Sequence, residues 1–181
     1  RDARRLWRQA GIAPSSARRF DVLDPACGPG VTSFTLAQDY PCVHVTGIDF
    51  GPVLERTRAI AHAMGVEDRV TLIEGDVKSA DYGGPFHLVV FGRILYYLDD
   101  DQAATALAKA HAALRPGGTL IVNEALVDEE LAKADAMVKK GVARKDVYAK
   151  IIAKGATAPV MIAAPAAPAG TPVAAAPAAN P

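Results

Sequence analysis

Between residues 20 and 127, short apolar runs alternate with longer segments of helical periodicity, and this alternation constrains the fold more than any other feature. Five runs rich in Val, Ile, Leu and Phe are predicted as strands, namely 20–26, 43–50, 70–76, 86–94 and 118–126. The predicted helices are 31–40, 52–65 and 100–118. Strands that alternate with helices are joined by right-handed crossovers. We therefore expect an α/β fold with a doubly wound, Rossmann-like, mostly parallel sheet.

The composition divides the chain into four segments. Half of its 181 residues are hydrophobic, which suffices for one core but hardly for two. We expect one folded domain over 20–127, a basic lead-in helix over 1–19 and a charged helical segment over 128–154. Residues 155–181 hold twelve alanines, six prolines and no charge, which predicts a disordered linker or tail. Because the chain begins with Arg1, we expect it to be a piece of a longer protein.

The net charge of zero hides an uneven distribution. Residues 1–19 carry six arginines against one aspartate, whereas residues 20–127 carry seven basic and fourteen acidic side chains. An acidic domain repels polyphosphate and suits a neutral or cationic ligand, although such a surface more often serves solubility. The basic lead-in lacks the interleaved aromatic residues of a nucleic-acid surface, so we expect a solvated helix face and no nucleic-acid partner.

Several other classes of function find no support in the sequence. No run reaches the roughly 18 consecutive apolar residues of a membrane span, so we expect no membrane partner. Cys27 and Cys42 make no disulfide framework, and a reducing cytoplasm is the simplest compartment. We also expect no metal, because the four histidines lack metal-ligand spacing and the acidic run 99–101 at a helix start is more typical of a cap.

The loop "DPACGPG" lies where the first predicted strand ends and the first predicted helix begins, a place where doubly wound sheets bind ligands. A dinucleotide site needs G-x-G-x-x-G, but here Gly28 and Gly30 are followed by Ser33. No G-K-[ST] of a phosphate-binding loop follows either. Asp24 precedes the glycines, and a carboxylate there disfavours phosphate and suits a cationic ligand.

Two further acids end the second and third predicted strands. Asp49 comes 19 residues after Gly30, where an acid accepts two hydrogen bonds from a ribose diol. Asp76 ends the third strand, where a carboxylate can accept from an adenine amino group. Together with Asp24, acids at three consecutive strand ends are stronger evidence for a ligand site than the glycines alone.

The motifs "VLDPACGPG", "VTGIDF", "GVEDRVTLIEGDV" and "ALRPGGTLIVNEAL" resemble those of class I S-adenosylmethionine-dependent methyltransferases in order and spacing. They are most similar to the catalytic half of small-molecule O-methyltransferases, over residues 20–127. The resemblance implies S-adenosyl-L-methionine as cofactor, a small-molecule methyl acceptor as partner, and about five of the usual seven strands. The expected cofactor-binding residues are Asp24, Ala26, Cys27, Gly28, Gly30, Asp49, Phe50, Asp76, Val77, Gly92 and Arg93.

The chain also departs from that family. The family often has an H-D-W-x-D stretch after the fourth strand, with its histidine as general base, whereas this chain has "YYLDDD" with Tyr96 in the histidine position. Tyr96 is therefore the candidate catalytic residue, although a neutral tyrosine is a poor base at neutral pH. Two alternatives stay open: a non-catalytic S-adenosylmethionine-binding module, and a truncated or fused fragment without turnover. A homodimer would form through segments that this chain lacks.

Overall fold

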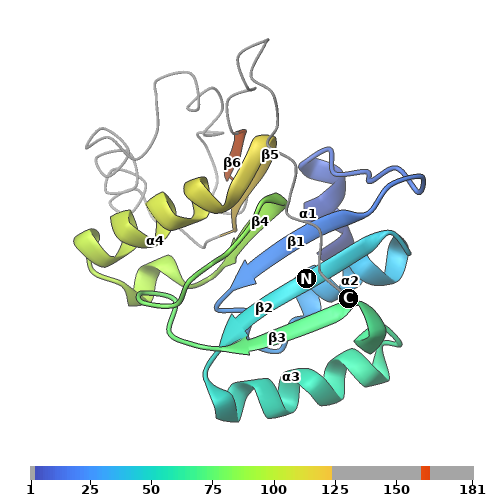
Figure 1. Ribbon diagram of the computed structural model, residues 1–181, viewed down its shortest axis with the longest axis horizontal. Helices are drawn as coiled ribbons and strands as arrows, with labels where there is room; N and C mark the ends of the chain where they lie inside the picture. The colour runs from blue at the N-terminus through green and yellow to red at the C-terminus, as the bar shows by residue number, and fades with distance from the viewer. Residues whose placement is uncertain (1–2, 124–159, 164–181) are drawn as a thin grey trace, which may run out of the picture.

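The computed structural model describes residues 3–123 and 160–163 (Figure 1). The elements follow in the order α1 (Ala3–Gln9), β1 (Phe20–Pro25), α2 (Val31–Asp39), β2 (Val43–Asp49), α3 (Gly51–Ala63), the 3-10 turn η1 (Glu67–Arg69), β3 (Val70–Glu74), β4 (Phe86–Gly92), the 3-10 turn η2 (Leu95–Tyr97), α4 (Asp100–Ala113), β5 (Leu114–Asn123) and β6 (Val160–Ala163). The longest described helix, α4, has 14 residues, and no helix in these ranges combines the length and apolarity that a bilayer crossing needs.

The strands form one six-stranded sheet in the order β3-β2-β1-β4-β5-β6. Strands β1 to β5 run parallel, and β6 pairs with β5 in the antiparallel sense. The chain builds outward from β1 through β2 to β3, then returns to β4 on the other side of β1. The predicted doubly wound, mostly parallel α/β class is confirmed.

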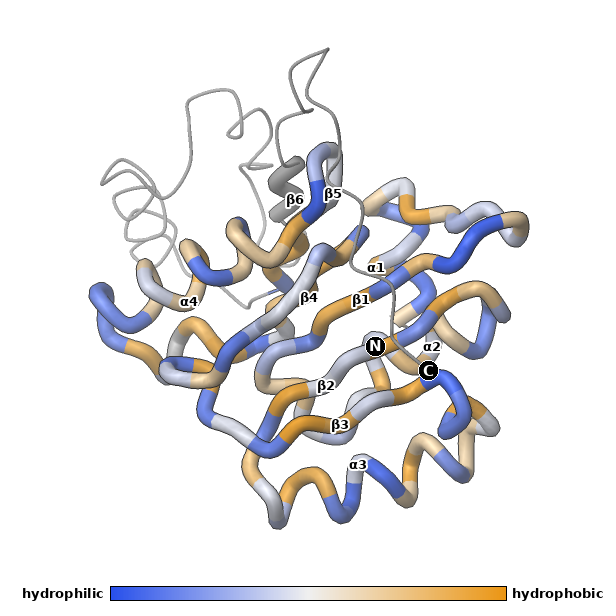
Figure 2. The backbone as a smooth tube through the Cα atoms, viewed as in Figure 1, coloured by the Kyte–Doolittle hydropathy of each residue, from blue (hydrophilic) through white to orange (hydrophobic). Residues whose placement is uncertain are grey.

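Helices cover both faces of the sheet, as Figure 1 shows. Successive residues of a strand point to opposite sides, so apolar neighbours such as Val22 and Leu23 require cover on both faces. Val22 packs in a buried cluster with Trp7 of α1 and Phe34 of α2, to which α3 also contributes. Its neighbour Leu23 packs in a second cluster with Leu107 of α4. Both Val22 and Leu23 are fully buried, so β1 is covered on both faces, and Figure 2 shows the hydrophobic stretch in the middle of this strand.

The basic lead-in is helical only over α1, since the chain turns at Gly11 with a φ of 65°. The expected solvated face is only part of this helix, because the Trp7 indole N–H donates to Oγ1 of Thr35 at 3.3 Å and is buried. On the outer side, the Arg4 guanidinium pairs with the Asp39 carboxylate at 2.8 Å. Helix α1 is therefore packed against α2 rather than free in solvent.

The sheet has one strand more than the five predicted. Residues 160–163 of β6 pair with β5 in the register Ile121 to Met161, inside the segment expected to lack fixed structure. That expectation is wrong at these four residues. The Val-Met-Ile run has the β propensity to add an edge strand, and the alanines and prolines around it concealed this signal. The rest of 155–181, and all of 128–154, lie outside the described residues.

Strand β5 begins earlier than expected, at Leu114 rather than at Gly118. The pairing with β4 shifts register between the pairs Phe86 to Leu114 and Leu88 to Thr119. The intervening Arg-Pro-Gly-Gly residues form an irregular start to the strand at the amino-terminal edge of the sheet. The predicted helix therefore ends at Ala113, before the proline and glycines.

Candidate functional site

The sheet changes direction between β1 and β4, and the crevice at the carboxyl ends of these strands is where doubly wound folds bind ligands. Two residues other than glycine adopt positive φ among the described residues, Ala26 at 68° and Arg93 at 61°. Ala26 directly follows β1, and Arg93 directly follows β4. Backbone in this unfavourable region is concentrated at functional sites, and here both instances flank the same crevice.

The glycine loop after β1 needs both of its glycines, for different reasons. Gly28 and Gly30 have φ values of 53° and 71°, in the left-handed region that other residues rarely adopt. A Cβ atom on Gly30 would overlap the ring of Phe34, so this glycine is required for packing. A Cβ atom on Gly28 would meet nothing within 4 Å, so this glycine faces open space where a ligand can approach.

Asp49, the last residue of β2, holds that loop in place. Its Oδ2 accepts the peptide N–H of Gly28 at 2.7 Å, and its Oδ1 accepts the N–H of Phe50 at 2.8 Å. The Asp49 side chain is only partly buried, and each carboxylate oxygen can accept a second hydrogen bond. The carboxylate thus keeps acceptor capacity on the side of the crevice.

A buried hydroxyl on α3 fixes the loop from below. Oγ1 of Thr57 lies 2.6 Å from the carbonyl oxygen of Gly28 and 2.9 Å from that of Val53. Thr57 is fully buried, so its single proton has only these two carbonyls to bond. Gly28 is therefore held by its N–H on β2 and by its carbonyl on α3.

A second carboxylate is buried beneath the loop. Asp24 is 3% exposed, and burial raises the pKa of its carboxyl group to about 6. A hydrogen bond from Ser33 lowers this pKa, and the neighbouring charge of Asp49 raises it. Burial also raises the pKa of the Cys27 thiol, with Asp24 and Asp49 adding to the effect. Cys27 packs against Gly47 and is a small structural residue rather than a reactive thiolate.

The third acid, Asp76, lies in a turn that follows β3. Its Oδ1 accepts the N–H of Lys78 at 2.8 Å, and its Oδ2 pairs with the Lys78 ammonium at 3.3 Å. The next residue, Val77, is buried, and its carbonyl oxygen accepts from the Tyr82 hydroxyl at 2.8 Å and the Lys109 ammonium at 3.2 Å. The Lys109 ammonium also lies 4.2 Å from the centre of the Tyr82 ring. Helix α4 therefore anchors the turn that carries Asp76.

The remaining predicted residues line the same edge. Phe50 is 57% exposed at the start of α3, an unusual place for a large apolar ring, and it directly follows Asp49. Gly92 ends β4, and the N–H of Arg93 donates to the carbonyl oxygen of Asn123 at 3.1 Å. Tyr96 belongs to η2, but its side chain lies outside the described part of the structure. Its proposed catalytic role stays a prediction.

The acidic run at 99–101 is a helix start, as predicted. The Asp99 carboxylate accepts the N–H of Gln102 at 2.9 Å, and the Gln102 side chain returns a bond to the N–H of Asp99. This reciprocal pair is a capping box. Within residues 3–123 and 160–163, no group of three His, Cys, Asp or Glu side chains is placed to bind a metal.

Sequence reasoning missed the residues that support the loop from behind. Thr57 supports the glycine loop and Lys109 supports the turn of Asp76, and neither was singled out in the sequence, whereas Ser33 was noted only because it stands where a third glycine would fall. A signal was present for Thr57, because a threonine on the apolar face of a helix needs a buried acceptor. Nothing in the sequence indicated that this acceptor is the carbonyl of Gly28.

The site as a whole suits a cationic nucleoside. Asp24 and Asp49 place negative charge beneath and beside an open glycine loop, and Asp49 has acceptor capacity for a diol. The exposed Phe50 ring offers a flat apolar surface next to that carboxylate. A pyrophosphate would be repelled by the same carboxylates, which agrees with the absence of both phosphate-binding motifs.

A family model described as a methyltransferase domain matches residues 22–118. The chain is 34% identical over 109 residues to 3-amino-4-hydroxybenzoate 4-O-methyltransferase of Streptomyces cremeus. It is 29% identical over 109 residues to carboxy-S-adenosyl-L-methionine synthase of Chromohalobacter salexigens. Each alignment covers 59% of this chain but only 29% and 40% of the respective relative, so the chain spans less than half the length of both.

Solved structures share the fold. The S-adenosylmethionine-dependent methyltransferase SibL superposes with a TM-score of 0.69 at 24% identity, over 84% of this chain and 52% of SibL. A family 2 O-methyltransferase of Planctomyces limnophilus, in complex with apigenin, gives 0.59 at 26% identity, over 77% and 46%. CalS10 of Micromonospora echinaspora, an amino pentose methyltransferase with bound S-adenosylmethionine, gives 0.54 at 27% identity, over 70% and 49%.

Proposed function

The chain belongs to the methyltransferase-domain family, and on that premise we propose that it binds S-adenosyl-L-methionine for methyl transfer to an oxygen of a small molecule. The resemblance that its four motifs suggested is confirmed, since the family model matches more than half of the chain, residues 22–118 of 181. The observation that carries the proposal is the bond from the Gly28 N–H to Asp49, which holds an open glycine loop beside a partly free carboxylate.

Four of the predicted cofactor-binding residues have a stated part in this proposal. When bound, S-adenosyl-L-methionine supplies a methyl group on a positively charged sulfur. Asp49 would accept from the ribose hydroxyls, and the exposed Phe50 ring would offer a surface for the adenine. Gly28 leaves room for the methionine moiety, and the negative charge of Asp24 and Asp49 stabilises the cation.

Two comparisons support oxygen as the acceptor atom. The Streptomyces cremeus relative is a 4-O-methyltransferase of a hydroxybenzoate, and the Planctomyces limnophilus neighbour holds apigenin. The Chromohalobacter salexigens relative is a synthase of carboxy-S-adenosyl-L-methionine, so modification of the cofactor itself is the competing outcome. With Tyr96 in place of a histidine, we propose that proximity and desolvation supply more of the rate than proton removal does.

Incubation of the protein with S-adenosyl-L-methionine and a set of phenols, followed by mass spectrometry, tests the proposal. Methylated phenol together with S-adenosylhomocysteine is the expected product pair when the full-length protein is used. In a second incubation, a carboxylic acid able to donate a carboxyl group replaces the phenols, and a carboxylated cofactor formed there would contradict O-methylation. Binding of S-adenosylhomocysteine without any turnover would support the alternative, a binding module without catalysis.

We propose further that the protein works in the cytoplasm on a small-molecule acceptor, without nucleic acid or membrane as partner. Both cysteines are free, which agrees with a reducing compartment. A homodimer remains part of the proposal for the full-length protein. Its oligomeric state in solution is the measurement that tests this.

A further inference from the structure

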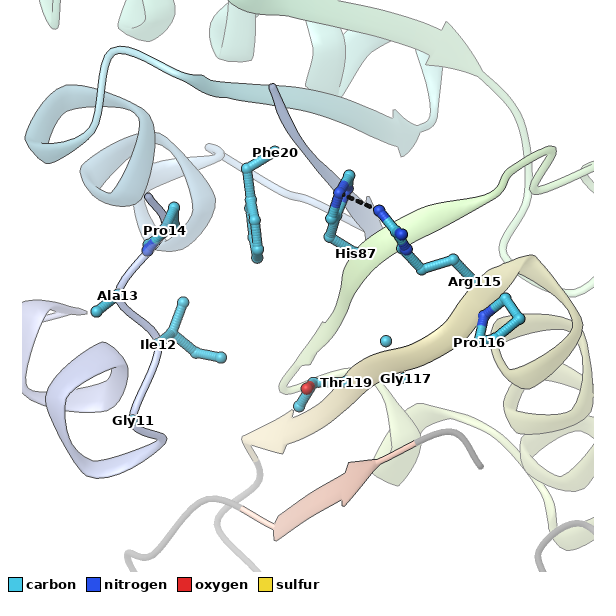
Figure 3. A pocket seen from close by; sticks show the side chains of 11 residues that line it. Gly11, Ile12, Ala13, Pro14, Phe20, His87, Arg115, Pro116, Gly117 and Thr119 are labelled. Atoms are coloured by element: carbon cyan, nitrogen blue, oxygen red, sulfur yellow. Dashed lines mark hydrogen bonds between the residues drawn. The ribbon is translucent and has the colours of Figure 1, made fainter. Parts of the chain in front are cut away.

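A pocket lies at the amino-terminal edge of the sheet, opposite the site described above. Its volume is about 380 Å³, which is within the range of small-molecule sites. Its lining comes from the segment after α1, from the starts of β1 and β4, and from the irregular start of β5, as Figure 3 shows. The candidate cofactor site uses the carboxyl ends of β1, β2 and β4, so the two sites share no residue.

Apolar side chains stand on two sides of this pocket. Ile12 and Pro14 lie on one side, and Pro116 lies on the other. Phe20 and His87 stand between them as a pair of rings, with centroids 4.8 Å apart and planes inclined by 31°. A flat apolar molecule would find aromatic and proline surfaces on more than one side.

Two polar side chains, those of His87 and Arg115, meet between these apolar side chains, and each directs a donor at the other. Nδ1 of His87 accepts the peptide N–H of Asp21 at 3.0 Å, so the proton of the neutral ring belongs on Nε2. Nε2 faces Nη1 of Arg115 at 2.6 Å, and a guanidinium has no acceptor. The opposite tautomer only moves the conflict to the Asp21 amide.

Protonation of His87 does not remove the conflict. Burial and the neighbouring Arg115 cation lower the pKa of His87, and they outweigh the Asp21 carboxylate, which raises it. That carboxylate lies 3.8 Å from Nδ1 and is paired with Arg19 at 2.6 Å. It therefore lies beside the ring nitrogen that Arg115 does not contact. Within residues 3–123 and 160–163, no carboxylate forms an ion pair with Arg115.

An anionic acceptor between the two donors would satisfy both. The Asp21 amide is fixed in β1 and holds the His87 ring, whereas the Arg115 side chain is exposed, so an acceptor that enters between the two has to displace only the guanidinium. A carboxylate accepts such paired N–H groups with short, charge-assisted bonds. We propose that this pocket binds a small aromatic carboxylate, its charge between Arg115 and His87 and its ring against Phe20 and the prolines.

Calorimetric titration of the 181-residue chain with benzoate tests this site, with benzamide as the uncharged analogue of the same shape and inorganic phosphate as an anion without a ring. We expect benzoate to bind at about millimolar affinity or better, and benzamide at least tenfold more weakly. Failure of benzoate to bind in that range, or equal binding of benzamide, would overturn the proposal. Phosphate that binds as tightly as benzoate would overturn the role of the ring.

Variants locate the binding. Arg115→Gln should weaken benzoate binding at least about tenfold, because it removes the charge-assisted bonds. Arg58→Gln, on the exposed side of α3, is the matched control and should leave binding unchanged. Equal affinity of Arg115→Gln and the wild type would refute the site. Should Arg115→Gln melt early, Arg115→Lys keeps the charge but loses the fork, and should give an intermediate affinity.

Amide chemical shifts provide a readout that does not depend on variants. Benzoate should shift the amide resonances of Phe20 and Thr119 at the amino-terminal edge, and should leave Gly28 and Gly30 unaffected. Shifts confined to the two glycines would place the anion in the cofactor site and overturn the proposal. The same titration separates this inference from the proposed function, since it requires neither cofactor nor turnover.

Discussion

The peptide N–H of Gly28 donates to Oδ2 of Asp49 at 2.7 Å, and this bond joins the loop after β1 to the end of β2. The carboxylate that we propose as the ribose acceptor is therefore also the clamp of the glycine loop. Loss of this side chain removes two functions together, one in the free protein and one in the complex. Experiments on Asp49 need to separate these two effects.

Asp49→Ala should weaken binding of S-adenosylhomocysteine by about 2 to 4 kcal/mol, because two charge-assisted bonds to the ribose are lost together with the loop clamp. Calorimetry at constant pH measures this directly. Asp49→Asn keeps one acceptor oxygen and should lose less. Asp68→Ala, which removes an exposed carboxylate of η1, is the control and should bind like the wild type. Unchanged affinity of Asp49→Ala would place the cofactor elsewhere.

The two loop glycines should respond differently to alanine. Gly30→Ala introduces left-handed strain of about 1 to 2 kcal/mol and also a clash with Phe34, so it should lower the melting temperature more than Gly28→Ala does. Gly28→Ala fills open space and should mainly reduce cofactor affinity. Gly65→Ala shares the positive φ and the open surroundings far from the loop, and it should leave affinity unchanged. An equal loss of affinity in Gly28→Ala and Gly65→Ala would contradict this division.

Thr57→Val replaces the hydroxyl under the loop with a methyl group of similar size. The carbonyl of Gly28 then loses its buried donor, which should lower the free energy of unfolding by about 1 to 3 kcal/mol. Urea unfolding measures that change, and titration with S-adenosylhomocysteine should show a parallel loss of affinity. Thr57→Ser restores the hydroxyl and should recover most of both. If Thr57→Val were as stable as the wild type, the bond to Gly28 would be of no consequence.

Much of the fold was predictable because it rests on local patterns. Leu88, Val89, Val90 and Phe91 form a continuous apolar run in β4, and a run of this kind between helical segments predicts a parallel strand buried on both faces. The glycines and the acid of the loop were likewise visible, since left-handed turns and strand ends restrict the residue types that fit. Each of these signals needs only a few neighbouring positions.

Features that join distant parts of the chain were not predictable. The bond between Thr57 and Gly28 spans 29 positions, and the contact between Arg115 and His87 spans 28. No periodicity reports such pairs, because they depend on which helix covers which strand. Strand β6 was missed for a related reason. Its four residues gain stability from the free edge of β5, not from their own sequence surroundings.

Removal of residues 155–181 should therefore lower the melting temperature, contrary to what an unstructured tail would predict. The truncation deletes β6 and leaves the outer hydrogen-bonding groups of β5 without a partner strand. A shorter truncation that removes only residues 165–181 keeps β6 and should have a smaller effect. Calorimetric melting of both forms beside the full chain measures the difference. Equal melting temperatures for all three would mean that β6 adds nothing to the sheet.

Asp24 should make the stability of the protein depend on pH. Burial raises its folded pKa from 3.8 to about 6, which corresponds to about 3 kcal/mol. Below pH 4 the carboxyl group is neutral in both states, and its favourable contribution is fully present. As the pH rises from about 4 to about 6, the unfolded chain ionises first, so this contribution is lost and stays lost above pH 6.

Asp24→Asn, which cannot ionise, should therefore gain stability over the wild type as the pH rises through this window. We expect the difference in unfolding free energy to grow by up to about 3 kcal/mol between pH 4 and pH 7, as measured by urea unfolding at each pH. The same variant should bind S-adenosyl-L-methionine more weakly at pH 7, because a negative charge under the cation is gone. A constant difference across the window would mean that Asp24 keeps an ordinary pKa. In that case burial would not disfavour the charged form of Asp24, and the carboxylate would be ionised beneath the loop even at pH 5.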